Sequence, residues 1–210
     1  MEFDKNELEK MLLKKRHEAE LLQEALDEAA KKDEELKNRP SLSLEEVTEQ
    51  MGKGMVYFPN APIRFRLVSF FNKRLSMLLP IDYLNRHTTQ DDLAVLVNDA
   101  MGISLTLQYT TSQKKDVTFD EVKRGMVGQL KAAGIYIELL EEGEVEDDVA
   151  PTYFMTYRMP IPQGVMYNMV FYAINRTDGA MIIGNYNCFY KDIDKWENII
   201  KATISYLDFH

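Results

Sequence analysis

The chain has 210 residues, of which 45% are hydrophobic, so it can form one good-sized domain with a core, and global disorder is excluded. Its formal net charge of -9 argues against a binding surface for nucleic acids or anionic membranes, because such surfaces need clustered lysine and arginine. We find no apolar signal core at the N-terminus and no run near the roughly 20 apolar residues that span a bilayer.

The first predicted element is one long charged helix over residues 4–38. Apolar and small residues recur along it with heptad spacing, interrupted by polar ones: Leu8, Leu12, Lys15, Ala19, Leu22, Leu26, Ala29, Asp33 and Leu36. Such a helix would be roughly 50 Å long, which is longer than a small domain is wide. Three interpretations stay open: a solvated extension, a self-associating or partner-binding coiled coil, and a helix packed along its own domain.

The next segment is predicted to be a linker, so that the chain divides into a helix (1–40), a linker with a short helix (41–62) and an α+β sandwich (63–210). Pro40 ends the long helix, since proline cannot continue the hydrogen-bond ladder. Ser43 and Glu46 form a capping-box pattern ahead of the short helix. Residues 52–54 are expected to be a hinge and 59–62 a loop.

The sandwich is predicted to begin with strands and one amphipathic helix. We expect strands at 63–71, 75–79, 93–97 and 103–109, a helix at 118–133, a strand at 135–140 and an acidic turn at 141–148. Thr118 and Glu121 repeat the capping-box pattern, and Gly134 suits the residue after a helix end. The acidic turn lacks the spacing of a preorganised calcium loop.

Residues 152–190 give the clearest signal, a meander of three strands rich in aromatic and β-branched residues. Asp178-Gly179 between two apolar runs predicts a tight hairpin, which would place Phe171 opposite Tyr186. A turn over residues 160–164 would pair Met159 with Val165.

Because side chains alternate along a strand, these two turns sort the meander into two faces. The predicted core face holds Tyr153, Met155, Tyr157, Tyr167, Met169, Phe171, Tyr186, Cys188 and Tyr190. The opposite, mixed face holds Thr152, Phe154, Thr156, Arg158, Asn168, Val170, Tyr172, Asn185 and Asn187. A final helix, capped by Asp192 and carrying Trp196, is expected to dock on the core face. The elements together predict an α+β fold, an antiparallel sheet of about six or seven strands packed between helices.

No constellation of catalytic or metal-binding residues emerges from the sequence. His17, His87 and His210 fall on different elements, and there is no Cys-x-x-Cys pair. Cys188, the single cysteine, lies mid-strand on the predicted core face, where we expect an inert packed thiol. It rules out an intrachain disulfide and fits a cytoplasmic protein.

Residues 63–209 combine the predicted order of elements with two local patterns. One is Ser76-Met77-Leu78-Leu79-Pro80, and the other is the closing pattern of Gly184 to Cys188, Trp196 and Ile204 to Phe209. By these features the segment resembles the PsbP-like superfamily. That superfamily includes photosystem II extrinsic proteins, a Ran-binding nuclear-import factor and bacterial chaperones of secreted effectors. The resemblance implies an antiparallel sheet between helices, no active site, and work done by binding proteins.

We therefore expect a non-enzymatic cytoplasmic protein-binding module, an adaptor or chaperone, without a cofactor. The expected partner is a protein or peptide segment, with self-association through residues 4–38 and no binding of nucleic acid or membrane. The candidate binding residues lie on the mixed face: Phe154, Thr156, Asn168, Val170, Tyr172, Asn185 and Asn187. Two alternatives remain: a small-ligand pocket or undetected hydrolase using the asparagines and Tyr172, and a purely oligomerising module.

Overall fold

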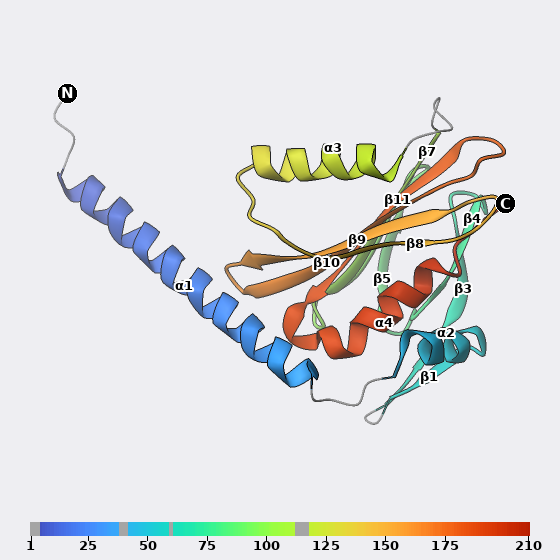
Figure 1. The fold of residues 1–210 in the computed structure, drawn as a ribbon, viewed down its shortest axis with the longest axis horizontal. Coiled ribbons are helices and arrows are strands. Elements are labelled where there is room, and N and C mark those ends of the chain that lie inside the picture. Colours follow the sequence, from blue (N-terminus) through green and yellow to red (C-terminus); the bar gives the residue numbers. More distant parts are fainter. Residues whose placement is uncertain (1–4, 38–41, 59–60, 112–117) are drawn as a thin grey trace.

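The computed structural model describes residues 5–37, 42–58, 61–111 and 118–210 of the protein. Helix α1 (Lys5–Lys37) comes first and confirms the long N-terminal helix. Its C-terminal half packs on the domain through the buried Ala25 and Ala29, whereas its N-terminal half extends away (Figure 1). The C-terminal half of this helix therefore packs along its own domain, and the N-terminal half is an extension. The side chains of Leu8 and Leu36, and the predicted helix end at residues 38–41, lie outside the described part.

The predicted linker contains more regular structure than expected. Helix α2 (Leu44–Gly52) has the predicted capping box, with Ser43 Oγ accepting from the Glu46 amide and the Glu46 carboxylate accepting from the Ser43 amide. A short hairpin follows, of β1 (Met55–Tyr57) and β2 (Pro62–Arg64). The predicted strand 63–71 is thus two strands, because β2 belongs to this hairpin and β3 (Arg66–Phe70) to another sheet.

A small sheet combines β3 with β4 (Leu75–Leu79) and the C-terminal β12 (Asp208–Phe209), in the order β12-β4-β3. The turn between β3 and β4 places Phe71, Asn72 and Lys73 in the left-handed region, at φ 54°, 57° and 68°. Asparagine tolerates that region better than the other two residues do. The turn begins one residue earlier than the sequence suggested.

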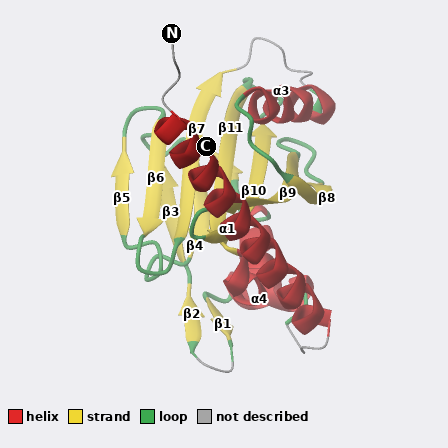
Figure 2. Cartoon of the chain, turned by 90° about the vertical axis from the view of Figure 1, so that its left-hand side faces the viewer, coloured by secondary structure: helices red, strands yellow, loops and turns green. Residues whose placement is uncertain are grey.

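The main sheet has seven antiparallel strands in the order β5-β6-β7-β11-β10-β9-β8, as predicted in number and direction (Figure 2). Its strands are β5 (Arg86–Thr89), β6 (Leu93–Asn98), β7 (Ile103–Thr111), β8 (Glu138–Val145), β9 (Thr152–Ile161), β10 (Gly164–Ile174) and β11 (Ala180–Phe189). Helix α3 (Phe119–Ala132) lies on one side of it, and the turn η1 (Tyr190–Asp192) leads to α4 (Ile193–Ile204) on the other (Figure 1). This arrangement confirms the α+β fold class.

The core lies between the main sheet and α4, as expected. Trp196, Ile199 and Ile200 of α4 are buried in one cluster with Met169 and Tyr186 of the sheet. We call this side of the sheet the α4 face and the opposite side the α3 face. The predicted side-chain cap by Asp192 was wrong, since its side chain makes no capping hydrogen bond.

Strand β8 corrects the acidic turn predicted at residues 141–148. It continues through Glu144 to Val145 and pairs with β9 as an edge strand. Its glutamates alternate between the two faces of the sheet. Glu141 pairs with Lys201 of α4, and Glu142 pairs with Lys123 of α3. This acidic segment can form a strand because α4 and α3 each place a lysine beside one of its glutamates.

The register of β10 and β11 differs from the prediction without changing the faces. Tyr167 lies opposite Cys188, and Met169 opposite Tyr186. The loop spans residues 175–179 rather than Asp178-Gly179 alone. In it the Asn175 side chain accepts from the Thr177 amide, and the Asp178 side chain from the Ala180 amide. The longer loop shifts the pairing by an even number of residues, so Tyr167, Met169, Tyr186 and Cys188 stay on the α4 face.

The faces of β9 were predicted wrongly. Strands β9 and β10 continue to the pair Ile161 and Gly164, so the reversal is made by Pro162-Gln163 instead of residues 160–164. This moves the pairing by one residue, and a slip of one residue turns every side chain to the other face. Tyr153, Met155 and Tyr157 therefore lie on the α3 face, and Phe154, Thr156 and Arg158 lie on the α4 face.

Candidate functional site

The seven predicted binding residues divide between the two faces of the main sheet. Five share the α3 face as predicted: Asn168, Val170, Tyr172, Asn185 and Asn187. Phe154 and Thr156 lie on the opposite face, both buried, which separates them from the others. The candidate site is therefore the α3 face without these two residues, and with their neighbours Met155 and Tyr157 in their place.

A row of polar side chains crosses the centre of this face. Asn168 lies directly opposite Asn187 in the neighbouring strand, and Asn187 lies opposite Ser104. The Ser104 hydroxyl donates to Asn187 Oδ1 at 3.0 Å. Asn185 continues the row beside Thr106 of β7. The alternation of Ser104, Thr106 and Gln108 in the sequence pointed to this face, but the sheet order was needed to join them to the asparagines.

Two amide groups in this row are buried and have no hydrogen-bond partner among the described residues: Nδ2 of Asn168 and Oδ1 of Asn185. Asn168 as a whole is 5% exposed. Buried polar groups are nearly always hydrogen-bonded, and an unpaired one costs about 1–3 kcal/mol. The α3 face therefore carries one donor and one acceptor whose hydrogen-bonding capacity the described chain does not use.

Apolar and aromatic side chains surround the polar row. Met155, Tyr157 and Tyr172 are buried on this face although they lie outside the main core cluster. Burial raises the pKa of Tyr172 to about 12, with smaller contributions from Tyr153, Glu121 and Glu144. Burial also raises the pKa of Tyr157. Both hydroxyls therefore stay protonated at neutral pH and remain hydrogen-bond donors.

Helix α3 lies over this face (Figure 1), and Phe119 and Lys123, near its N-terminal end, contact the sheet. Phe119 stacks on Tyr153 with ring centroids 5.7 Å apart, and Tyr153 stacks on Tyr172 at 5.3 Å. Lys123 and Glu142 form an ion pair at 2.5 Å. The helix has its predicted capping box at Thr118 and Glu121, yet none of its residues is buried. It is a well-capped helix that covers the face without being built into the core.

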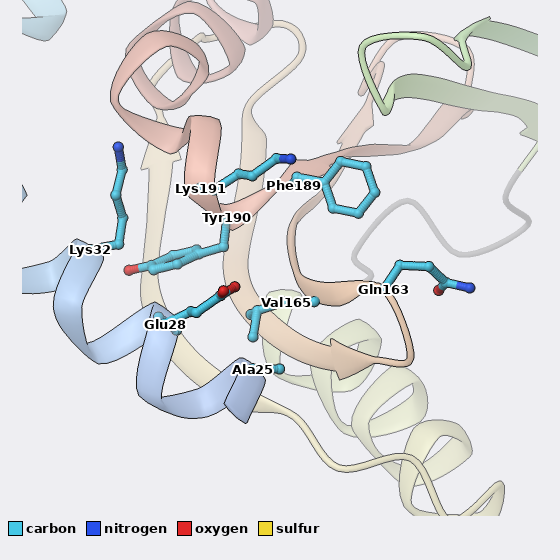
Figure 3. Close-up of a pocket in the computed structure, with 10 residues that line it drawn as sticks. Ala25, Glu28, Lys32, Gln163, Val165, Phe189, Tyr190 and Lys191 are labelled. Atoms are coloured by element: carbon cyan, nitrogen blue, oxygen red, sulfur yellow. The ribbon is translucent and has the colours of Figure 1, made fainter. Parts of the chain in front are cut away.

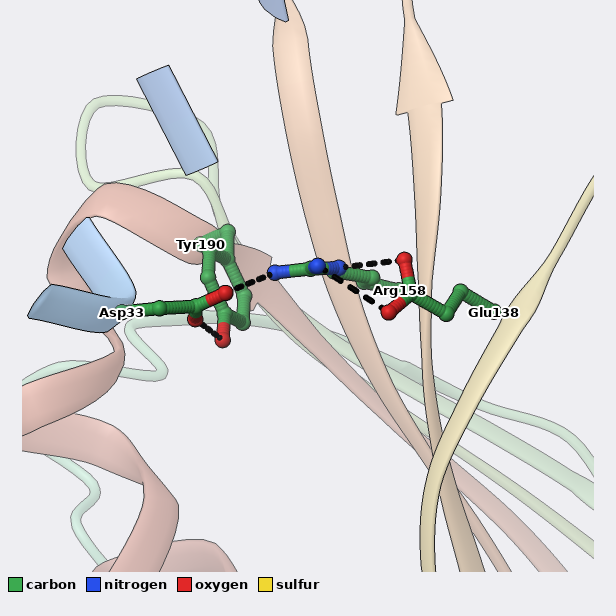
Figure 4. Close-up of polar contacts among 4 residues, drawn as sticks. All are labelled: Asp33, Glu138, Arg158 and Tyr190. Atoms are coloured by element: carbon green, nitrogen blue, oxygen red, sulfur yellow. Dashed lines mark hydrogen bonds and ion pairs between the residues drawn. The ribbon is translucent and has the colours of Figure 1, made fainter. Parts of the chain in front are cut away.

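A second polar cluster, which sequence reasoning did not find, joins α1 to the sheet (Figure 4). The Arg158 guanidinium donates to Asp33 Oδ2 at 2.8 Å and to both carboxylate oxygens of Glu138, at 2.8 and 3.0 Å. The Tyr190 hydroxyl donates to Asp33 Oδ1 at 2.5 Å. Burial alone would lower the pKa of Arg158, but the two carboxylates outweigh it and raise that pKa.

The sequence did contain one signal for this cluster. Asp33 stands at a heptad position that an apolar residue would ordinarily fill. Its partner in the structure is Arg158, which the correct β9 register places on the α4 face. Only the combination of both observations would have predicted an ion pair between the helix and the sheet.

A cavity of about 200 Å³ lies beside this cluster, between α1 and the turn that joins β9 to β10 (Figure 3). Ala25, Glu28 and Lys32 line it from α1, and the Tyr190 ring points toward that helix (Figure 3). A shallower hollow of about 320 Å³ lies next to Phe119 and Tyr153. Neither is lined by Asn168, Asn185 or Asn187.

The three histidines and the cysteine do not come together in one site. Cys188 is buried, and burial raises its thiol pKa. His17 and His87 are exposed on α1 and β5, and His210 Nε2 lies 2.9 Å from the Ser76 hydroxyl. The described ranges contain no group of three or more His, Cys, Asp and Glu residues that could hold a metal ion. They also contain no helix long and apolar enough to cross a membrane.

With an antiparallel sheet between helices and a partly covered second face, the chain has the PsbP-like fold that the resemblance implied. The solution structure of cyanobacterial PsbP (CyanoP) from Synechocystis sp. PCC 6803 matches it with a TM-score of 0.52 and 13% identity, covering 74% of this chain and 98% of that one. At this identity the similarity establishes the fold alone.

Two further solved structures match at lower scores. The Ran-binding protein Mog1p of Saccharomyces cerevisiae has a TM-score of 0.45 and 12% identity, over 70% of this chain and 96% of its own. The protein PA94 of Pseudomonas aeruginosa has a TM-score of 0.44 and 14% identity, over 67% of this chain and 94% of its own. No protein-family model matches the sequence, and no curated protein does.

Proposed function

We propose that this chain is a non-enzymatic protein-binding module, of an adaptor or chaperone-like kind, that holds a partner segment on the α3 face. The observation that carries the proposal is the buried pair of unpartnered amide groups on Asn168 and Asn185. A peptide backbone offers a carbonyl acceptor and an amide donor side by side, which is what these two groups lack. The surrounding Met155 and Tyr157 would take apolar side chains of the same segment.

Because helix α3 covers this face, a macromolecular partner that displaces the helix is favoured. Helix α3 contacts the sheet through an aromatic stack and an ion pair, and its apolar residues are at most half-buried. A segment of low local stability is the kind that moves when a partner binds. The partner segment would replace α3 over the centre of the face, with Tyr172 and Tyr153 remaining as its aromatic floor.

The chemistry of the described residues supports a binding function over a catalytic one. A thiol nucleophile needs an exposed, electropositive setting that lowers its pKa, and Cys188 has the reverse. The small-ligand alternative would require a cavity lined by the asparagines. The cavities beside α1 and beside Phe119 lie elsewhere, so neither favours that alternative.

The proposal includes a cytoplasmic location and self-association through residues 4–38. The single buried thiol is compatible with a reducing compartment. Met11, Leu12 and Leu13 on α1 are 59%, 59% and 66% exposed, which leaves apolar surface without a partner in the described chain. These features support the proposal independently of the α3 face.

Site-directed photocrosslinking tests the binding face. A photoreactive residue at Gln108, which is exposed on the α3 face, should capture a protein partner in the source cells. The same residue at Leu67, 65% exposed on β3, is the control. A synthetic peptide from the captured region should then bind the purified protein. Asn168→Ala and Asn185→Ala should each weaken that binding about tenfold, as expected for one lost buried hydrogen bond.

Two results would overturn the proposal. One is equal capture from Gln108 and Leu67, which would mean that the α3 face has no preferred partner. The other is a peptide whose affinity is unchanged in both asparagine variants, which would place its binding site elsewhere.

A further inference from the structure

The N-terminal half of α1 carries an unpartnered apolar stripe. Leu12, Lys15, Ala19 and Leu22 follow one another at spacings of three and four residues, so they lie on one side of the helix. Leu12 and Leu22 are 59% and 43% exposed. Met11, also 59% exposed, flanks the same side. An exposed helix of this length is marginal in water without tertiary packing, so a partner for the stripe would stabilise it.

The charges along the same stretch are unevenly distributed between its two ends. Residues 10–17 carry Lys10, Lys14, Lys15 and Arg16 and no carboxylate. The following residues, 18–28, carry no lysine or arginine, and their acidic residues are Glu18, Glu20, Glu24, Asp27 and Glu28. The helix is therefore basic toward its N-terminus and acidic toward the domain. A partner helix that complements it must have the opposite order of charges.

A second copy of the same helix has that order when it runs antiparallel. We infer that two copies of this chain pair through residues 10–24 of α1, antiparallel, with the two-fold axis near residue 17. Leu12 of one copy then packs on Leu22 of the other, and Lys15 lies beside Ala19. In a parallel pair the basic stretches would face each other, and so would the acidic ones, which is unfavourable.

The attachment of α1 to the domain leaves room for this pairing. Burial begins at Ala25 and Ala29, where the helix meets the sheet, while residues 10–20 are exposed. The N-terminal half extends beyond the globular part (Figure 1). The paired segment is roughly 20 Å long and buries few leucines, so we expect a weak dimer, with a dissociation constant on the order of 10 µM. The inference deepens the self-association in the proposed function and is independent of the α3 face.

Light scattering of the full chain tests the association first. The protein should be a dimer at about 100 µM and a monomer at about 1 µM, as the expected affinity requires. The double variant Leu12→Ala, Leu22→Ala should be monomeric at both concentrations. Leu13→Ala is the matched control, because Leu13 is still more exposed but lies off the stripe. A wild-type protein that stays monomeric at the higher concentration overturns the inference.

Disulfide cross-linking tests the direction. Cys188 is buried, so an introduced cysteine is the reactive thiol. A mixture of Leu12→Cys and Leu22→Cys chains should form a disulfide between the two variants. The second contact of the pair, between the remaining Leu22 and Leu12, stays intact. Leu12→Cys alone should not cross-link, since position 12 of one copy lies about 15 Å from position 12 of the other along an antiparallel pair. Efficient cross-linking of Leu12→Cys with itself would overturn the antiparallel direction. Failure of peptide binding at the α3 face would leave both results untouched.

Discussion

Gly184 shows how closely the α4 face is packed at the level of single residues. A Cβ atom at this position would lie 2.0 Å from the far end of the Phe171 ring, which is itself buried. Gly184→Ala should therefore lower the free energy of unfolding by about 1–3 kcal/mol, because the ring has no room to move aside. Urea denaturation measures this.

The matched control for that substitution is Gly128→Ala in α3, where no atom lies within 4 Å of the added methyl group. It should leave the free energy of unfolding unchanged or raise it by up to about 1 kcal/mol, through helix propensity. If Gly184→Ala were as stable as Gly128→Ala, the packing of Phe171 against β11 would be looser than described.

Tyr172 should make the stability of the protein depend on alkaline pH. Burial raises its pKa to about 12, from about 10 in an unfolded chain. Its contribution is complete below pH 10 and is lost as the pH rises from about 10 to 12, because the unfolded state releases the proton first. Tyr172→Phe should make that decline shallower by up to ~1.4 kcal/mol per pH unit.

Urea denaturation at several pH values between 9 and 12 measures this effect, within the range set by the two pKa values. Tyr136→Phe is the control. Tyr136 is 63% exposed, so this substitution should leave the dependence of stability on pH as it is in the wild type. Identical profiles for wild type and Tyr172→Phe would show that the Tyr172 hydroxyl is solvated above the sheet.

The elements of the fold followed from the sequence more reliably than their pairing did. Both capping boxes, the long helix and the burial of Trp196 in one cluster with Met169 and Tyr186 were predictable, because they rest on local chemistry and on periodicity. The edge strand β5 was missed because its residues, Arg86 to Thr89, are polar and exposed, so they show no apolar alternation.

The candidate site depended on turn length, which the sequence did not determine. Around β9, the choice between a reversal at Pro162-Gln163 and one at residues 160–164 decided whether Phe154 or Met155 belonged to the site. Around β11, the predicted register was shifted by an even number of residues, so Asn185 stayed on the predicted face. The asparagine row was therefore predictable and its β9 border was not.

Helix α3 should be the most readily opened element of the sheet region. It has no buried residue, so its amides should exchange with solvent much faster than those of β10 in a hydrogen-exchange experiment. Phe119→Ala removes the stack on Tyr153 and should speed exchange within α3 about 3- to 10-fold, the equivalent of one aromatic pair, while β10 is unchanged.

Tyr57→Ala is a suitable control for this experiment, because Tyr57 is an exposed aromatic residue on the distant β1. It should leave exchange in α3 at the wild-type rate. Slow exchange in α3, unaffected by Phe119→Ala, would mean that the helix is a fixed part of the domain and that partner entry by displacement is wrong.

At the scale of the whole molecule, α1 combines two roles along one helix. Its second half is fastened by Asp33 to Arg158 and Tyr190, and by an ion pair of Lys32 with Asp194 of α4 at 3.3 Å. Its first half makes no such contact among the described residues up to position 20, which are exposed. The boundary between attachment and projection therefore falls near Leu21, the first half-buried residue from position 10 onward.

Two truncations should separate these roles, measured at a protein concentration where the chain is monomeric. Removing residues 1–20 should change the free energy of unfolding by less than about 0.5 kcal/mol, because the described side chains among them, at positions 10–20, are exposed, and such residues contribute little. Removing residues 1–38 takes away the buried Ala25 and Ala29 and the Asp33 carboxylate, and should cost about 2–4 kcal/mol. Equal losses for the two truncations would contradict the boundary at Leu21, because the projecting half would then support the domain.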